Sequence, residues 1–188
     1  MRRVVCLGDS LTEGYVVNKN QSWVSLLNEE MDSQFINCGI SGDTTTGMIA
    51  RLQRIFIDEN PDLLIILGGT NDLFFNINNG NIISNIIAMS RHAKHYNVEV
   101  VIGIPTPFFP TSLSKEWFLS EDGYMNRIKE FQKVLKQITI AEKIPCIDFS
   151  TNMTEDLFLE DGLHPNAKGH QKMKENAMNV LKNVLNKQ

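Results

Sequence analysis

The feature that most constrains this sequence is the alternation of short apolar runs with longer amphipathic segments along the whole chain. Such alternation is typical of βα units, in which a helix crosses over the sheet after each strand. The apolar runs predict five strands, at residues 4–7, 35–38, 63–67, 98–104 and 144–149. Between and after these runs, apolar residues recur at helical spacing, and each set marks one buried face. The sets lie within residues 23–31, 48–56, 82–87, 125–138 and 173–184.

The residue types in the runs predict the order of the strands. The first, third and fourth runs are apolar on successive residues, as strands covered on both faces require. The second run is short, and the fifth contains Pro145, which cannot donate to a central ladder. We therefore expect an α/β protein with a parallel sheet of order 2-1-3-4-5 and helices on both faces. Ligands are expected beyond the carboxyl ends of strands one and three, where the strand order reverses.

Length and charge exclude several classes of protein. The chain has 188 residues, which for domains of roughly 100 to 200 residues predicts one domain spanning residues 1–188. Hydrophobic residues make up 42%, enough to bury a core. The formal net charge of −4 provides no positive field for a nucleic acid, so we expect no such partner. No apolar segment approaches the roughly 20 residues that cross a bilayer, so stable membrane insertion is not expected.

The three cysteines, Cys6, Cys38 and Cys146, are odd in number and show no CxxC spacing. We interpret them as buried free thiols. The apolar run before Gly8 is only four residues long, from Val4 to Leu7, whereas a signal peptide needs an apolar stretch of about 7 to 15. Because no leader is visible, we expect the cytoplasm as the location.

A hydroxyl flanked by glycines follows the first strand. Ser10 lies between Gly8 and Gly14, in a strand-to-helix turn that lets a nucleophile protrude and backbone N–H groups face a developing anion. Ser10 could equally cap the helix that follows. A phosphate-binding loop is less favoured, because neither GxGxxG nor GxxxxGK[ST] occurs.

Two further segments offer hydrogen-bond donors after the second and third strands. Gly42 lies in a turn with two glycines that feeds a helix, where Asp43 or Thr44 could be the cap. Glycine at a turn usually supplies only permissive backbone angles, so its role as a donor is one of two interpretations. Asn71 follows the third strand, beside the expected switch point, and its side chain can donate an N–H.

The fourth segment pairs a carboxylate with an imidazole. Asp161 precedes His164 by three residues, with Gly162 between them and Pro165 at the expected start of a helix. In this arrangement the carboxylate can accept the Nδ1–H bond that orients a catalytic base. A histidine before a helix is more often a cap or a surface residue. The conjunction of a hydroxyl, two donors, a base and an acid at one sheet edge favours the catalytic interpretation.

In order and spacing, these four segments resemble the blocks of the SGNH/GDSL hydrolase superfamily, in its thioesterase I, lysophospholipase and arylesterase branch. The residues that carry the resemblance are Gly8 to Leu11, Gly42, Gly68 to Asp72, and Asp161 to Pro165. The resemblance implies a flavodoxin-like three-layer α/β/α sandwich. It also implies a catalytic triad of Ser10, Asp161 and His164, and an oxyanion hole formed by Ser10, Gly42 and Asn71.

The resemblance implies a serine esterase or acylhydrolase that cleaves small-molecule carboxylic esters or thioesters through an acyl-enzyme, without a cofactor. A carbohydrate O-acetylesterase is an alternative, since the triad does not distinguish the two. A catalytically silent binding module on the same fold is a further alternative, but no triad position is replaced here. The oligomeric state is left open.

Asp9 and Asp72 lie near these segments and, with His164, could suggest a metal site. The resemblance assigns them structural hydrogen bonds instead, and no two-His spacing supports a metal site, so we expect none.

Aromatic residues near the expected sheet edge are candidates for apolar pocket walls. They could equally anchor their loops. These candidates are Phe74, Phe75, Phe108 and Phe109, with Trp117 and Phe118 as further ones.

Overall fold

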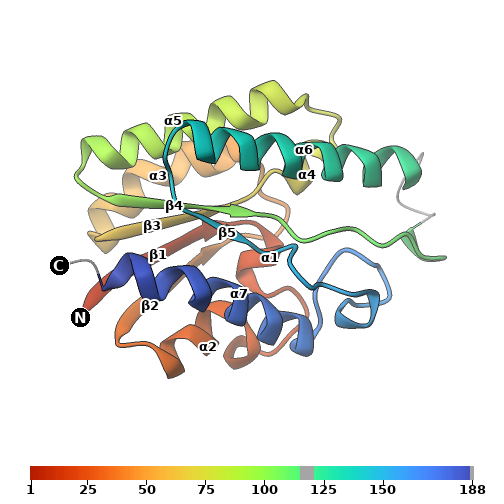
Figure 1. Cartoon of the computed structure of the whole chain (residues 1–188), viewed down its shortest axis with the longest axis horizontal. Helices are drawn as coiled ribbons and strands as arrows, with labels where there is room; N and C mark the ends of the chain where they lie inside the picture. Colours follow the sequence, from red (N-terminus) through yellow and green to blue (C-terminus); the bar gives the residue numbers. More distant parts are fainter. Residues whose placement is uncertain (115–120, 187–188) are drawn as a thin grey trace.

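A computed structural model of the chain describes residues 1–114 and 121–186. In this part of the chain five strands form a parallel sheet of order β2-β1-β3-β4-β5 (Figure 1). The strands are β1 (Arg2–Gly8), β2 (Ser33–Gly39), β3 (Leu63–Leu67), β4 (Glu99–Ile104) and β5 (Cys146–Asp148). The predicted strand order is therefore confirmed.

Helices cover both faces of the sheet and make a three-layer α/β/α sandwich. Figure 1 shows α3, α4, α5 and α6 on one face and α1, α2 and α7 on the other. The helices are α1 (Ser10–Glu13), α2 (Trp23–Glu30), α3 (Thr45–Glu59), α4 (Thr70–Phe74), α5 (Asn79–His95), α6 (Glu121–Ala141) and α7 (Ala167–Leu185), with short 3-10 helices η1 (Lys19–Gln21) and η3 (Glu155–Leu157). The flavodoxin-like three-layer sandwich that the family resemblance implied is thus confirmed.

The central strands are apolar on successive residues because each of their faces packs against a different helix layer. In β1, Val5 and Leu7 join the cluster beneath α3, α5 and α6, whereas Val4 and Cys6 join the cluster beneath α2 and α7. All four side chains are fully buried. The edge strand β2 alternates between buried and exposed residues over its first three positions, as a strand with one covered face does.

Polar caps fix where the helices begin. Ser22 accepts a hydrogen bond from Ser25 N–H at the start of α2, Thr44 from Gly47 N–H at α3, and Asn166 from Lys168 N–H at α7. An N-cap acceptor pairs one of the backbone N–H groups that the first turn of a helix leaves without a partner.

The observed elements differ from the predicted ones at their ends. The predicted fifth strand, 144–149, is reduced to Cys146–Asp148, because Ile144 N–H closes the end of α6 on Thr139 O and Pro145 has no N–H. The expectation that Pro165 starts the last helix is wrong: Asn166 is the cap, and α7 begins at Ala167.

The three cysteines are free, as predicted, but only Cys6 is buried. Cys38 and Cys146 are half-buried. They lie on the edge strands β2 and β5, each of which has a neighbouring strand on one side only. Among the helices of residues 1–114 and 121–186, none combines the length and the apolar character needed to cross a membrane.

The register of the sheet brings the chemically interesting segments to one edge. Gly8 at the end of β1 is aligned with Gly39 of β2 and with Leu67 of β3. The chain that follows each of these residues therefore leaves the sheet at the same carboxyl edge. Ser10 and Asn71 lie on two of these segments, and Gly42 lies on the third.

Candidate active site

Ser10 is the first residue of α1, immediately beyond the carboxyl end of β1. The cap of this helix is Asp9, whose Oδ1 accepts a hydrogen bond from Leu11 N–H at 2.9 Å. The alternative that Ser10 itself caps the helix is therefore wrong, and its hydroxyl is available for other contacts. Gly8 makes this tight turn possible, because a Cβ there would lie only 2.6 Å from Leu67 O.

His164 joins Ser10 to Asp161 through both of its ring nitrogens. Nε2 lies 3.0 Å from Ser10 Oγ, and Nδ1 lies 2.7 Å from Asp161 Oδ2. The other carboxylate oxygen of Asp161 accepts hydrogen bonds from Leu163 N–H at 2.8 Å and His164 N–H at 2.9 Å. A carboxylate fixed in this way holds the imidazole with Nε2 directed at the hydroxyl.

The turn that carries Asp161 and His164 is anchored on the loop after β4. Phe109 N–H donates to Gly162 O, and Thr111 Oγ1 donates to Glu160 O. Gly162 has φ +67°, and a Cβ there would lie 1.7 Å from Phe109 O, so this approach requires glycine. These contacts bring a segment far along the chain to the edge where Ser10 lies.

The electrostatics of the turn favour an ionised Asp161. Burial alone would raise the pKa of Asp161, but the hydrogen bonds from the His164 ring and from two backbone N–H groups outweigh it and lower the pKa below its usual value. Asp161 therefore carries its negative charge beside His164, where it can stabilise an imidazolium.

Asn71 and Gly42 are brought together by Asp43. The Asn71 Nδ2 group, at the start of α4, donates to Asp43 O at 2.9 Å, which leaves the second N–H of the amide for another acceptor. Gly42 precedes Asp43 in the turn after β2, with φ +80° and no heavy atom within 4 Å of where its Cβ would be. The turn thus leaves open space beside the Gly42 backbone.

Arg51 of α3 clamps this turn to the ends of two strands. Its guanidinium contacts Asp43 Oδ2 at 2.8 Å, Cys38 O at 2.8 Å and Gly8 O at 3.0 Å. Because one planar fork makes all three bonds, the ends of β1 and β2 and the Gly42 turn are held in fixed relative positions.

Two buried carboxylates, Asp9 and Asp72, connect the segments at this sheet edge by hydrogen bonds. Asp9 Oδ2 accepts a hydrogen bond from Thr70 Oγ1 at 2.8 Å, and Asp72 accepts from Thr45 N and Thr45 Oγ1 at 2.9 and 2.6 Å. Complete burial raises the pKa of Asp9 to about 6 despite its hydrogen bonds. Each carboxylate links two different loops at the sheet edge.

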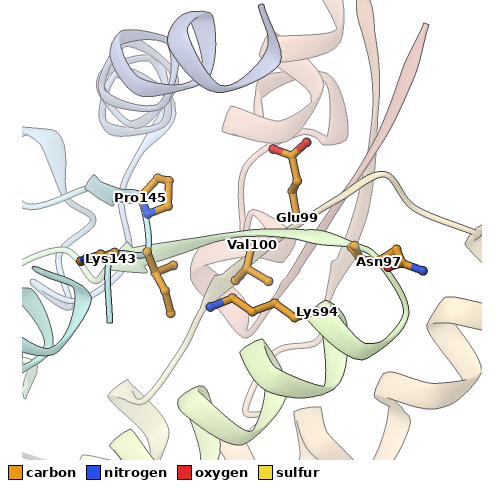
Figure 2. Close-up of a pocket in the computed structure, with 8 residues that line it drawn as sticks. Lys94, Asn97, Glu99, Val100, Lys143 and Pro145 are labelled. Atoms are coloured by element: carbon orange, nitrogen blue, oxygen red, sulfur yellow. The ribbon is translucent and has the colours of Figure 1, made fainter. Parts of the chain in front are cut away.

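A groove of about 380 Å³ lies elsewhere, at the amino end of β4 (Figure 2). Its lining includes Lys94, Glu99, Val100 and Lys143, from the end of α5, from β4 and from the turn before β5. The strands of a parallel sheet all run the same way, so this groove is at the opposite edge from Ser10 and plays no part in the Ser10 site.

A comparison with models of known protein families shows to which family this chain belongs. The model of the GDSL-like lipase/acylhydrolase family matches residues 6–172, a range that contains Ser10, Gly42, Asn71, Asp161 and His164. This chain is a member of the GDSL-like lipase/acylhydrolase family. The membership places it among the carboxylic ester hydrolases.

Named relatives of this GDSL-family chain are similar over most of its length. An arylesterase of Vibrio mimicus is 36% identical over 171 residues, covering 87% of this chain and 80% of the relative. Esterase TesA of Pseudomonas aeruginosa is 26% identical over 192 residues, covering 97% and 89%. The solved structure of the native M. smegmatis aryl esterase has the same fold, with a TM-score of 0.86 and 20% identity over 98% of this chain and 100% of the other.

The aromatic residues suggested as pocket walls take different positions in this GDSL-family fold. Phe74 and Phe75, at the end of α4, are exposed and contact each other. Phe108 is buried in the core, while Phe109 is partly buried and packs against Phe158. Trp117 and Phe118 lie outside the described residues.

Sequence reasoning missed Arg51 and Tyr15. Arg51 lies in the middle of an amphipathic helix, where its position alone gives no sign that it reaches back to two strand ends. Tyr15 follows the first motif directly, and its ring lies on that of His164, with centroids 4.5 Å apart. Only the fold brings these two rings together, because they come from opposite ends of the chain.

Proposed function

We propose that this chain is a serine esterase or acylhydrolase, with Ser10 as nucleophile, His164 as general base and acid, and Asp161 as the residue that orients His164. The observation that carries the proposal is the continuous hydrogen-bond path from Ser10 Oγ through both nitrogens of His164 to Asp161. Nucleophile, base and orienting acid in this sequence form the arrangement that activates a serine hydroxyl.

In the first half of the reaction, His164 Nε2 accepts the proton of Ser10 as Oγ attacks the ester carbonyl carbon. The carbonyl electrons move onto oxygen and give a tetrahedral oxyanion. When the carbonyl re-forms, the bond to the alcohol or thiol breaks, and His164 gives the leaving group its proton. An acyl group is then attached to Ser10.

In the second half, His164 takes a proton from water, and the hydroxide formed attacks the acyl carbon. The bond to Ser10 Oγ breaks, the proton returns from His164 to Ser10, and a carboxylic acid is released. Asp161 keeps its charge throughout and stabilises the imidazolium in both halves.

The oxyanion would be stabilised by Ser10 N–H, Gly42 N–H and the Asn71 side chain. Three features of the structure support this part of the proposal. Ser10 N–H is at the first position of α1 and has no intrahelical partner, the Gly42 turn is held by Arg51 through Asp43, and the Asn71 amide keeps one N–H beyond its bond to Asp43 O. Donors fixed before the reaction act without reorganisation.

The proposed substrates are small-molecule carboxylic esters or thioesters. The relatives named arylesterase and esterase support this class. Exposed Phe74 and Phe75 would supply an apolar wall for part of the substrate.

A chain-length series of p-nitrophenyl esters, from acetyl to palmitoyl, tests the proposal at neutral pH. Wild-type protein is expected to hydrolyse some of them, and Ser10→Ala is expected to lose nearly all turnover. Ser33→Ala is the matched control, since Ser33 is as buried as Ser10, at 7% exposure, but starts β2 at the opposite edge. Hydrolysis that persists in Ser10→Ala would contradict the nucleophile. Absence of any turnover would contradict the acyl-ester class, and acetylated carbohydrates would then be assayed.

A further inference from the structure

Tyr15 covers the imidazole of His164. The two ring centroids are 4.5 Å apart and the planes are inclined by 43°. The Tyr15 side chain nevertheless remains 46% exposed, so the core does not demand an aromatic residue at this position. The ring packs on the one side chain of the site that must transfer protons in both halves of the proposed reaction.

The backbone holds Tyr15 in place from both sides. Tyr15 N–H donates to Ser10 O at 3.2 Å, so the segment is tied to the turn of the nucleophile. Gly14, just before it, has φ +87°, and a Cβ there would lie 2.8 Å from Ser22 Cβ. Val16, just after it, has φ +68°.

The conformation of Val16 is costly, because a β-branched side chain strongly disfavours positive φ. Val16 is also exposed, so burial of its side chain does not offset the strain. A strained, exposed residue next to an aromatic ring on the general base points to a role in the site rather than in the core.

We propose that Tyr15 is a positioning residue for His164, which it holds in the orientation needed for proton transfer; this rests on the proposed function. Asp161 fixes Nδ1 but leaves the imidazole able to tilt about that bond. The Tyr15 ring restricts this tilt and keeps Nε2 on the line to Ser10 Oγ. An aromatic ring beside the imidazole also favours the imidazolium that forms as the proton moves.

Two esters with the same acyl group reveal such a role through their leaving groups. Ethyl butyrate expels an alkoxide, which needs the proton of His164, whereas p-nitrophenyl butyrate expels a phenolate that leaves without one, so that His164 releases its proton to water. A mispositioned His164 therefore slows the ethyl ester more. A loss of folded protein, or of a wall for the acyl chain, lowers kcat/KM for both esters by the same factor, because both esters carry the same butyryl group.

The variants are Tyr15→Leu, Tyr15→Phe and Val16→Gly, with Tyr96→Leu as the matched control. Tyr96 is 44% exposed and stacks on His92, with centroids 5.2 Å apart, so it repeats the Tyr–His contact away from the site. We expect Tyr15→Leu to lose about 3- to 10-fold in kcat/KM for the ethyl ester and less for the p-nitrophenyl ester. Tyr15→Phe is expected to keep most of the wild-type kcat/KM for the ethyl ester, because it retains the aromatic ring.

Val16→Gly provides a second, independent variant that keeps Tyr15 but frees its backbone. The same selective loss on the ethyl ester is expected, without a loss of thermal stability, because glycine adopts positive φ without strain.

The outcomes separate this proposal from the proposed function. Equal losses on both esters, a larger loss on the p-nitrophenyl ester, or a Tyr15→Leu rate equal to that of Tyr96→Leu would each overturn the role of Tyr15, while the Ser10→Ala blank stays inactive. Wild-type turnover that does not depend on Ser10 would instead overturn the proposed function, and the role of Tyr15 with it.

Discussion

Asp161 uses its two carboxylate oxygens for different tasks. Oδ1 accepts two backbone N–H groups and shapes the turn, while Oδ2 accepts from the His164 ring. Because these bonds lower its folded pKa, the stability that Asp161 contributes is present above its unfolded pKa of about 3.9 and is lost as pH falls through the folded value. One carboxylate thus contributes both to local stability and to the proposed chemistry.

Asn71→Ala is expected to lower kcat by about 10² to 10³, the usual effect of removing one oxyanion donor. The fold is expected to persist, because within residues 1–114 and 121–186 the Asn71 side chain makes one hydrogen bond, to Asp43 O. Asn176→Ala is the control, since it removes the same type of bond, at 2.9 Å to Thr151 O, on α7. Steady-state kinetics of both variants check this, and near-wild-type kcat in Asn71→Ala would remove Asn71 from the oxyanion hole.

His170 predicts how the fold responds to acid. Burial, with a smaller effect from the charge of His164, lowers the pKa of His170 to about 4, and its Nδ1 accepts Trp23 N–H. In the unfolded chain His170 is protonated below about pH 6.5, whereas in the folded chain it is protonated only below about pH 4. The free energy of unfolding therefore decreases by up to about 3 kcal/mol as the pH drops through this window.

His170→Gln is expected to remove this part of the acid sensitivity, because glutamine can accept the Trp23 N–H but does not titrate. Urea unfolding at pH 7, 6 and 5 measures it in both proteins. His92→Gln is the control, since His92 lies on the surface of α5. A wild-type pH dependence in His170→Gln would show that His170 does not cause the loss.

At the scale of elements, α3 fixes the turn that carries Gly42. Arg51, at the middle of this helix, bonds Asp43 and two strand-end carbonyls, and its side chain is 21% exposed. Arg54 lies on the same helix with an ion pair to Asp58, but its side chain is 76% exposed. One helix thus offers a half-buried clamp and an exposed pair for comparison.

Arg51→Met is expected to cost about 1 to 3 kcal/mol, because two carbonyls and a half-buried carboxylate lose their donor. It is also expected to lower kcat, since the Gly42 turn is no longer held. Arg54→Met is expected to change stability by less than about 0.5 kcal/mol. Urea unfolding and ester hydrolysis measure both effects, and equal values for the two variants would contradict the clamp.

The sequence predicted the elements better than their ends. Unbroken apolar runs identified β1, β3 and β4, because burial on both faces leaves a clear pattern. The ends of β5 depend on how α6 closes on Ile144, a tertiary contact that no local pattern encodes. The same holds for the aromatic residues: Phe108 and Phe75 look alike in sequence, but the path of each loop buries the first and exposes the second.

At the scale of the whole molecule, the sheet separates two apolar clusters and gathers the site at one edge. Both clusters pack on the same strands, and on this basis we propose that residues 1–188 fold as one domain. The four site segments were predictable because their residue types and order are distinctive. Arg51 and Tyr15 were not, since their partners lie in other elements and become neighbours only when the sheet forms.

The central claim is that Ser10 is an activated nucleophile, and covalent labelling tests it most directly. An uncharged alkyl fluorophosphonate reacts when a serine oxygen attacks phosphorus and fluoride leaves. This attack requires an oxygen that a neighbouring base has activated, so an ordinary serine hydroxyl is not modified. Mass spectrometry of the intact chain and its peptides is expected to show one adduct on Ser10 in wild type and in Ser33→Ala, and none in Ser10→Ala. An adduct on another residue, or equal labelling of Ser10→Ala, would contradict the account.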